Sequence, residues 1–162
     1  MMRLFRCICL FFALALLLSG CQASTGLNNQ QLRVLVQEGF EPHGDEWVLN
    51  LSVLLLFGFD QDMLSKDSET EIRRLSDTLR SVGINSLRIE GHADATGDES
   101  YNLQLSERRA NRVAEVFIYA GTAPQLISTR GMGSAFPIAS NETAEGRAQN
   151  RRVSIIVGPS FT

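Results

Sequence analysis

Two side chains of opposite charge, Asp94 and Arg109, have residue types and a spacing suited to binding a small charged ligand. Asp94 ends the run GHAD at residues 91–94, where a strand pattern gives way to a glycine-bearing loop. Arg109 follows fifteen residues later in a helical pattern, on the row that Tyr101 and Leu105 begin at intervals of four residues. A guanidinium beside such an apolar row requires a partner, because an unpaired buried charge is costly.

Two interpretations of this pair are open. In the first, Asp94 and Arg109 pair with each other or with neighbouring side chains and stabilise the fold. In the second, they bind a zwitterion through charge-assisted hydrogen bonds, the carboxylate to an ammonium and the guanidinium to a carboxylate. A helix start beside a strand end suits the second interpretation, because its unpaired N–H groups and its dipole attract an anion.

The hydrophobic periodicity around the pair predicts strands that alternate with helices. Strands are expected over residues 47–57, 87–91, 126–130 and 152–157, two main helices over 65–82 (starting at Ser65 or Ser68) and 99–120, and a short helix over 142–148. The predicted fold class is α/β (α+β), a two-layer sandwich with a mixed four-stranded sheet and two main helices on one face. The strand over 87–91 and the helix over 99–120 would position Asp94 and Arg109.

The stretch around this pair resembles the OmpA-like peptidoglycan-binding domain. The usual pattern of that family is GHTD, a Gly three residues later, and then YN, LS, RA and V along a helix. The corresponding residues here are Gly91-His92-Ala93-Asp94, Gly97, Tyr101-Asn102, Leu105-Ser106, Arg109-Ala110 and Val113. Residues 145–147 (EGR) and 150–153 (NRRV) match the family's tail. The resemblance covers roughly residues 53–157, and the domain is predicted to span residues 47–162.

The resemblance implies that the domain grips the diaminopimelate residue of the peptidoglycan stem peptide without cleaving it, so neither enzyme activity nor a cofactor is expected. Asp94 would bind the ammonium of the side-chain amino-acid end, and Arg109 the carboxylate of that same end. Ala93 stands where the family has Thr, so one hydroxyl hydrogen bond is lost. The backbone N–H of Ala93 is expected to remain available, which predicts weakened rather than abolished binding.

Four further residues are candidates for the same site. Asn102 and Leu105 belong to the matched helical pattern. Phe59 and Asp60 stand at the family's F-x-F-D element and would edge the pocket. A plain transition from strand to loop is an equal alternative for these two residues.

The first twenty residues are predicted to be a lipoprotein signal peptide. Two arginines give a positive start, an apolar run covers residues 8–18, and LSGC at 18–21 is typical of bacterial lipoprotein processing. A transmembrane anchor is the alternative, but so short a run would hardly span a bilayer. Lipidated Cys21 would hold the mature chain on outer-membrane lipid, and Gln22 is typical of outer-membrane lipoproteins because an Asp there commonly signals inner-membrane retention.

Cysteine usage and charge exclude several kinds of site. Cys7 and Cys9 would leave with the signal peptide and Cys21 would be lipidated, so no thiol catalysis, disulfide or thiolate metal site is expected. His92 has only His43 as a second histidine, which argues against a histidine metal site. Removal of residues 1–20 takes two of the 15 basic residues and none of the 18 acidic ones. The resulting formal net charge of −5 does not suggest nucleic-acid binding.

Residues 21–46 are predicted to form a tether that contains one short amphipathic helix. Three apolar residues recur at helical spacing over 32–36, asparagines precede them as caps, and Gly39 follows as a stop. This helix would either pack on its own domain or offer its apolar face to a partner.

Residues 31–56 resemble a regulatory branch of the OmpA-like lipoproteins. The resemblance implies a sensor that captures a periplasmic repressor, relieves an inner-membrane diguanylate cyclase and so raises cyclic-di-GMP. The residues expected to bind that partner are Leu32, Leu35, Val36, Phe40, Trp47 and Leu55. A purely structural tether between outer membrane and cell wall is the alternative, and a second copy of the chain is a further candidate partner. A wall hydrolase is disfavoured, because Ser106 and Ser154 lack a histidine at a spacing that suggests a base.

Overall fold

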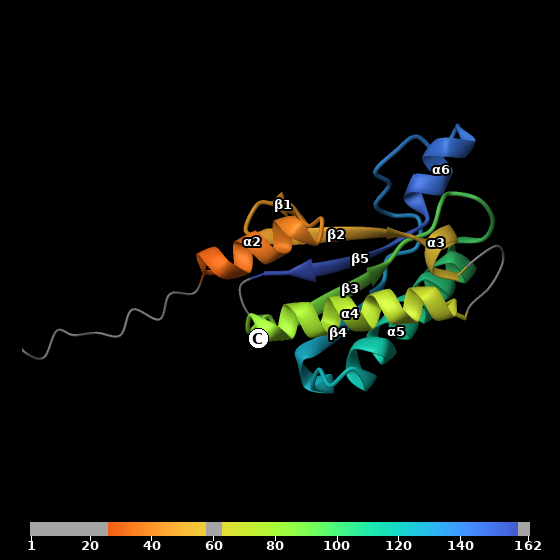
Figure 1. Cartoon of the computed structure of the whole chain (residues 1–162). Helices are drawn as coiled ribbons and strands as arrows, with labels where there is room; N and C mark the ends of the chain where they lie inside the picture. Colours follow the sequence, from red (N-terminus) through yellow and green to blue (C-terminus); the bar gives the residue numbers. More distant parts are fainter. Residues whose placement is uncertain (1–25, 58–62, 159–162) are drawn as a thin grey trace, which may run out of the picture.

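The computed structural model of the protein describes residues 26–57 and 63–158. The elements in chain order are α2 (Asn29–Gln37), β1 (Glu41–His43), β2 (Glu46–Ser52), α3 (Val53–Phe57), α4 (Lys66–Ser81), β3 (Leu87–Gly91), α5 (Glu99–Tyr119), the 3-10 helix η2 (Pro124–Leu126), β4 (Ile127–Gly131), α6 (Ala144–Asn150) and β5 (Arg152–Val157), as labelled in Figure 1. The predicted signal peptide, Cys21, Phe59 and Asp60 lie outside the described residues.

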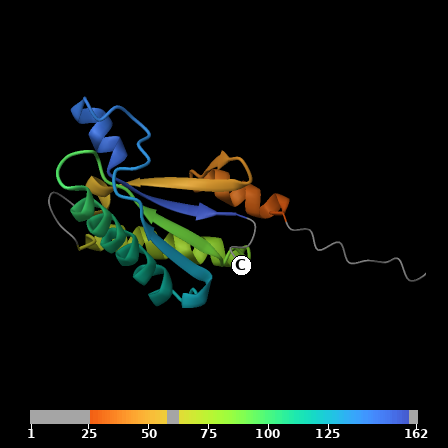
Figure 2. The same ribbon diagram turned by 180° about the vertical axis from the view of Figure 1, so that it is seen from behind.

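Within these residues the strands form one mixed sheet in the order β1-β2-β5-β3-β4. The β3–β4 pair is parallel, and the other neighbours are antiparallel. Figure 2 shows the sheet from behind, with α6 standing beyond one end. The predicted mixed sandwich is confirmed, with one strand more than expected. The additional strand, β1, pairs with β2 across a turn at Gly44, whose φ is +61°.

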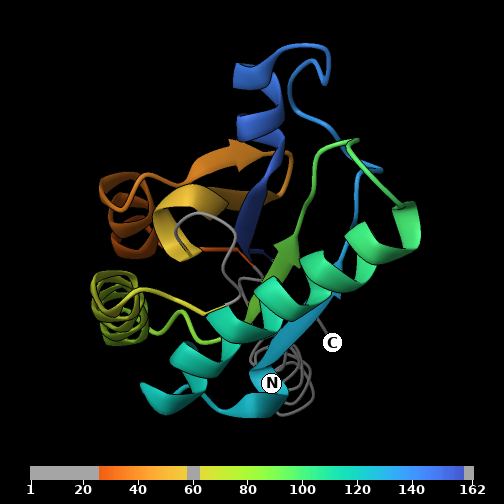
Figure 3. The same cartoon turned by 90° about the vertical axis from the view of Figure 1, so that its right-hand side faces the viewer.

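Two long helices, α4 and α5, lie on one face of the sheet, as predicted. α5 packs across β3 and β4, and α4 packs beside α5. Figure 3 shows α5 crossing the sheet, with α2 and α4 next to each other. The side chains with the deepest burial lie between these layers and include Phe117, Ile89 and Ile155, each fully buried. The apolar surface that they remove from water is the main stabilisation of the fold.

The predicted strand over residues 47–57 is wrong in its second half. β2 ends at Ser52, and the backbone N–H of Val53 donates to the carbonyl of Arg151, the residue before β5. Residues 53–57 then form the helix α3, with Val53, Leu56 and Phe57 buried at helical spacing. A continuous apolar run is compatible with either a buried strand or a helix, and leucine is a strong helix former.

The starts of α2 and α4 agree with the capping residues that the sequence suggested. Asn28 caps α2 and forms a capping box with Gln31. Ser65, the first of the two candidates, caps α4. Asp98, which was not among the predicted caps, caps α5. Each side chain accepts a hydrogen bond from a backbone N–H that would otherwise lack a partner in the first turn.

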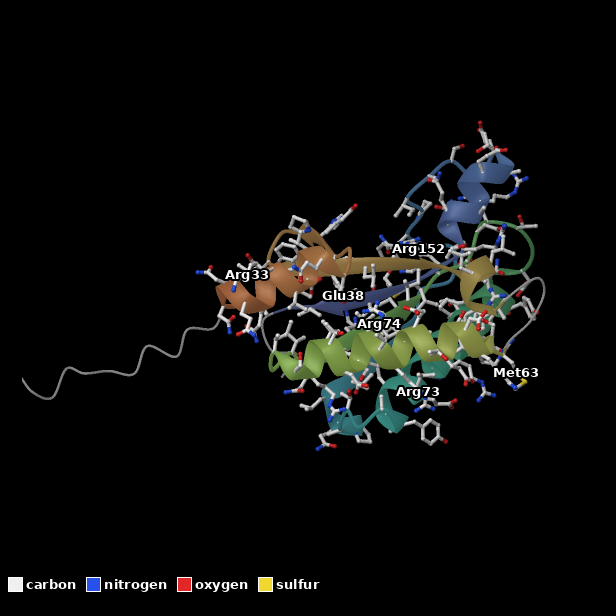
Figure 4. All side chains as sticks on the ribbon, viewed as in Figure 1. Arg33, Glu38, Met63, Arg73, Arg74 and Arg152 are labelled. Carbon is white, nitrogen blue, oxygen red and sulfur yellow. The ribbon has the colours of Figure 1, made fainter. Side chains whose placement is uncertain are left out.

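α2 packs on its own domain, which was one of the two expected arrangements. Leu35 is fully buried in the common core. Glu38 accepts two hydrogen bonds from the Arg74 guanidinium, at 3.0 and 2.9 Å, and Gln31 donates to a backbone carbonyl at the end of α4. Figure 4 shows Glu38 of α2 and Arg74 of α4 facing one another. The packed unit therefore includes part of the segment predicted as a tether.

Candidate ligand-binding site

The position of Arg109 follows from an unusually close approach between α5 and β3. A Cβ atom on Gly91 would lie 1.9 Å from the backbone oxygen of Ser106. A Cβ atom on Gly131 of β4 would lie 2.5 Å from the backbone oxygen of Leu103. Only glycine allows contact this close. The two glycines thus bring the first half of α5 onto the ends of β3 and β4, beside the loop that carries Asp94.

Asn102 of α5 holds that loop in place. Its side-chain Nδ2 donates to the Thr96 carbonyl at 2.9 Å and to the Asp94 carbonyl at 3.3 Å. Asn102 itself is buried. The structure therefore gives this predicted site residue a positioning role, because both donor hydrogens are directed at backbone of the loop.

Asp94 is nearly buried, and both of its carboxylate oxygens accept hydrogen bonds. The side chain is 10% exposed; Oδ1 accepts from the Thr96 backbone N–H at 2.8 Å, and Oδ2 accepts from Arg151 Nη1 at 2.5 Å. Burial alone would raise its pKa, but the bonds from Arg151 and Thr96 outweigh burial and hold the pKa of Asp94 below its ordinary value. Asp94 is therefore a carboxylate at neutral pH.

Arg109 is buried on α5, with 9% of the residue exposed. Its guanidinium carbon lies 5.7 Å from the centre of the Phe57 ring, a cation–π arrangement. Phe57 ends α3, and the first residue of α3, Val53, bonds to the backbone of Arg151. These contacts connect Asp94 to Arg109 through Arg151 and α3, so the two predicted site residues border the same end of the sheet.

The other two predicted positions differ in their availability. Ala93 is 8% exposed, and its backbone N–H donates to the Gly133 carbonyl at 2.8 Å. The expectation that this N–H would be available to a ligand is therefore wrong, since the loop after β4 passes beside it. Leu105 is half-buried on α5, one turn before Arg109.

A hydrogen-bond network behind the loop was only partly visible in the sequence. Asn150 is fully buried and donates from Nδ2 to Asn141 Oδ1 at 2.9 Å, and that same oxygen accepts from the Ala95 backbone N–H at 3.1 Å. Arg147 donates to the Asn141 carbonyl at 2.8 Å. The NRRV match was the signal for Asn150; nothing marked Asn141, which lies in an irregular segment. Together these residues fix α6 against the Asp94 loop.

His92 faces away from α5 and is 4% exposed. Burial, together with the nearby positive charge of Arg152, lowers the pKa of His92 from 6.5 to about 4. The imidazole is therefore neutral at neutral pH and remains so well into the acid range.

This lowered pKa predicts an acid-sensitive stability. Between pH 6.5 and pH 4 the unfolded chain takes up a proton at this position and the folded chain does not. The free energy of unfolding should therefore fall by about 3 kcal/mol as the pH falls through that window. Urea unfolding of the wild type and of His92→Gln, each at pH 7 and pH 4, measures how much of this loss of stability is due to His92. An equal loss of stability in both proteins would contradict the assignment.

The residues predicted to bind a protein partner are divided between core and surface. Leu35 and Phe40 are buried in the core, and Leu32 and Trp47 are half-buried. Val36 is 61% exposed and Leu55 is 77% exposed. With α2 packed as it is, only Val36 and Leu55 offer most of their surface to another protein.

Within residues 26–57 and 63–158, no group of three or more His, Cys, Asp or Glu side chains could hold a metal ion. Over the same ranges, the helices are either too short or too polar to cross a membrane.

Residues 56–151 match the OmpA family. The chain therefore belongs to the OmpA family, the class that its fold and its GHAD stretch already indicated. Among the relatives, the outer-membrane lipoprotein YfiB of Pseudomonas aeruginosa is 45% identical over 149 residues, covering 90% of this chain and 89% of the relative. The putative lipoprotein YfiB of Escherichia coli is 38% identical over 145 residues, covering 88% of this chain and 91% of the relative.

A solved structure agrees with this assignment. The cell wall anchor of the T6SS from Pseudomonas aeruginosa superposes with a TM-score of 0.68 at 28% identity, covering 80% of this chain and 97% of the other. The YfiB lipoproteins belong to the branch of the family that residues 31–56 resemble. These relatives confirm the predicted outer-membrane localisation and lipoprotein class.

Proposed function

We propose that the protein binds peptidoglycan noncovalently through the free amino-acid end of diaminopimelate, and that lipidated Cys21 links this contact to the outer membrane. The observation that carries the proposal is the placement of two nearly buried, oppositely charged side chains, Asp94 and Arg109, at one end of the sheet. The family's motif and the likeness to a structure described as a cell wall anchor support it.

In this mechanism Asp94 accepts a hydrogen bond from the ammonium of the ligand, and Arg109 donates to the carboxylate on the same carbon. Each charge-assisted contact contributes about 1.5–3 kcal/mol in a partly buried site. Phe57 orients the guanidinium by stacking, and Asn102 holds the loop that presents Asp94. The site contributes binding and orientation, and no bond of the ligand is broken.

Retention on purified sacculi tests this proposal. The mature domain should sediment with diaminopimelate-containing sacculi and release no muropeptides from them. Release of soluble muropeptides would instead favour a wall hydrolase, and a domain that stays in the supernatant would contradict wall binding.

The second part of the proposal is regulatory. We propose that the exposed apolar side chains Val36, on α2, and Leu55, on α3, help to capture a periplasmic repressor of the YfiR type, and that this capture controls an inner-membrane diguanylate cyclase. Two exposed apolar side chains and the extent of the likeness to YfiB lipoproteins favour this role over a purely structural tether. With α2 packed, the eight residue steps from Cys21 to Asn29 span at most about 28 Å. Release of the chain up to Glu46 would give 25 steps and a maximum span of about 90 Å.

Removing the exposed apolar groups should therefore separate the two roles. The double variant Val36→Asp, Leu55→Asp is expected to lose repressor capture by about tenfold or more, because both charges would be buried in the interface. Tyr119→Ser, at an exposed position at the end of α5, is the matched control. Co-purification of the repressor with each periplasmic domain measures the effect. Unchanged capture by the double variant would show that Val36 and Leu55 do not bind the repressor.

A further inference from the structure

The carboxylate proposed to bind the ligand ammonium already has a cationic partner in the protein. Arg151 Nη1 lies 2.5 Å from Asp94 Oδ2, although the two residues are 57 positions apart in the chain. A ligand ammonium that approaches Asp94 therefore meets a guanidinium on the same carboxylate. Two cations on one anion repel each other, and the repulsion is strong because Asp94 is only 10% exposed.

The backbone of Arg151 is fixed, whereas its side chain is not enclosed. Its backbone N–H donates to the Arg147 carbonyl at 3.1 Å, and its carbonyl accepts from Val53 at 3.0 Å. The side chain, however, is 41% exposed. The guanidinium can thus leave Asp94 by rotation of its own side chain, without any change in the sheet or in α6.

We propose that Arg151 is a specificity-determining residue. It is an internal counter-ion of Asp94 and is displaced only by a ligand that carries an ammonium and a carboxylate on the same carbon. This inference rests on the proposed function and names the feature of the ligand that the site selects.

The selection follows from the number of ion pairs before and after binding. A lone ammonium that displaces Arg151 replaces one charge-assisted hydrogen bond at Asp94 by another, and the released guanidinium gains no anion in return. A zwitterion brings its own carboxylate to the site, so the displaced Arg151 finds a new partner within reach. The number of ion pairs is therefore unchanged for the simple amine, whereas it rises by one for the zwitterion.

Arg109 alone does not explain such selection, because it contributes nothing toward keeping a simple amine away from Asp94. Arg151 opposes the simple amine directly by occupying the carboxylate. The two arginines therefore act in different ways. Arg109 stabilises the bound zwitterion, and Arg151 weakens the binding of a simple amine.

The test uses two soluble muramyl tetrapeptides that differ in the third residue, one with meso-diaminopimelate and one with Lys. Calorimetric titration of each against the wild type and Arg151→Gln gives four dissociation constants. The wild type should prefer the diaminopimelate form. Arg151→Gln should bind the Lys form about tenfold more tightly than the wild type does, because Arg151 no longer competes with the ammonium for Asp94. The affinity for the diaminopimelate form should change much less, because the variant also loses the contact between Arg151 and the ligand carboxylate.

Arg112→Gln is the matched control, since it removes the same charge from an exposed pair with Glu115 and should alter neither constant. Weaker binding of both tetrapeptides by Arg151→Gln would overturn the inference, because Arg151 would then be an ordinary ligand contact. Unchanged binding of the Lys form would also overturn it and leave the ion pair a purely structural role. Failure of the wild type to bind either tetrapeptide would instead refute the proposed function.

Discussion

Replacing either member of the charged pair, by Asp94→Asn or Arg109→Ala, is expected to weaken retention on sacculi by about tenfold or more. Asparagine keeps the shape of the Asp94 side chain but removes the charge that would attract the ammonium. Alanine at position 109 removes the guanidinium that would bind the carboxylate. Each variant thus loses one of two contacts made in a site with little access to water, where charge-assisted hydrogen bonds are strongest.

Co-sedimentation at several protein concentrations measures this loss. Asp77→Asn is a suitable control, because it removes an acidic charge from an exposed i,i+3 pair on α4. Asp94→Asn should stay folded, since the partner it releases, Arg151, is exposed enough to be solvated. If both variants stayed on sacculi as well as the wild type, the assignment of the pair to ligand binding would have to be abandoned.

The second large effect concerns stability. Gly91→Ala is expected to lower the free energy of unfolding by about 3 kcal/mol or more. The added methyl group would lie 1.9 Å from the oxygen and 2.6 Å from the carbonyl carbon of Ser106, both backbone atoms of α5. No side-chain rotation relieves this clash, so α5 must move away from β3, and the core between them must open.

Urea unfolding followed by circular dichroism measures this change. Gly26→Ala is the control, because an added methyl group there meets nothing within 4 Å, and its stability should match that of the wild type. A Gly91→Ala domain of normal stability would show that α5 and β3 are further apart than described. The position of Arg109 relative to Asp94 would then also need revision.

Much of the framework was predictable because local signals agreed with the fold. The alternation from Leu87 to Gly91 gave β3, and β5 runs from Arg152 to Val157 as predicted. The polar caps before α2 and α4 marked both helix starts. At these positions the hydrophobic period and the capping chemistry indicate the same element, which is the condition for a reliable prediction.

The errors arose where local signals were ambiguous or absent. The VLLLF run at residues 53–57 is equally compatible with a buried strand and with a helix, and tertiary packing favours the helix α3. The strand β1 has only three residues, all exposed, and so carries no hydrophobic alternation. The hydrogen bonds from Arg151 to Asp94 and from the Ala93 N–H to the Gly133 carbonyl join distant parts of the chain, and no spacing rule could have paired them.

Binding of diaminopimelate between Asp94 and Arg109 is tested most directly by a crystal structure of the mature domain with the meso-diaminopimelate muramyl tetrapeptide. We expect one amino-acid end of the ligand to lie between Asp94 and Arg109, with its ammonium on Asp94 and its carboxylate on Arg109. A ligand found instead on the opposite face of the sheet, in the groove lined by Arg88, Glu90 and Ser154, would contradict it.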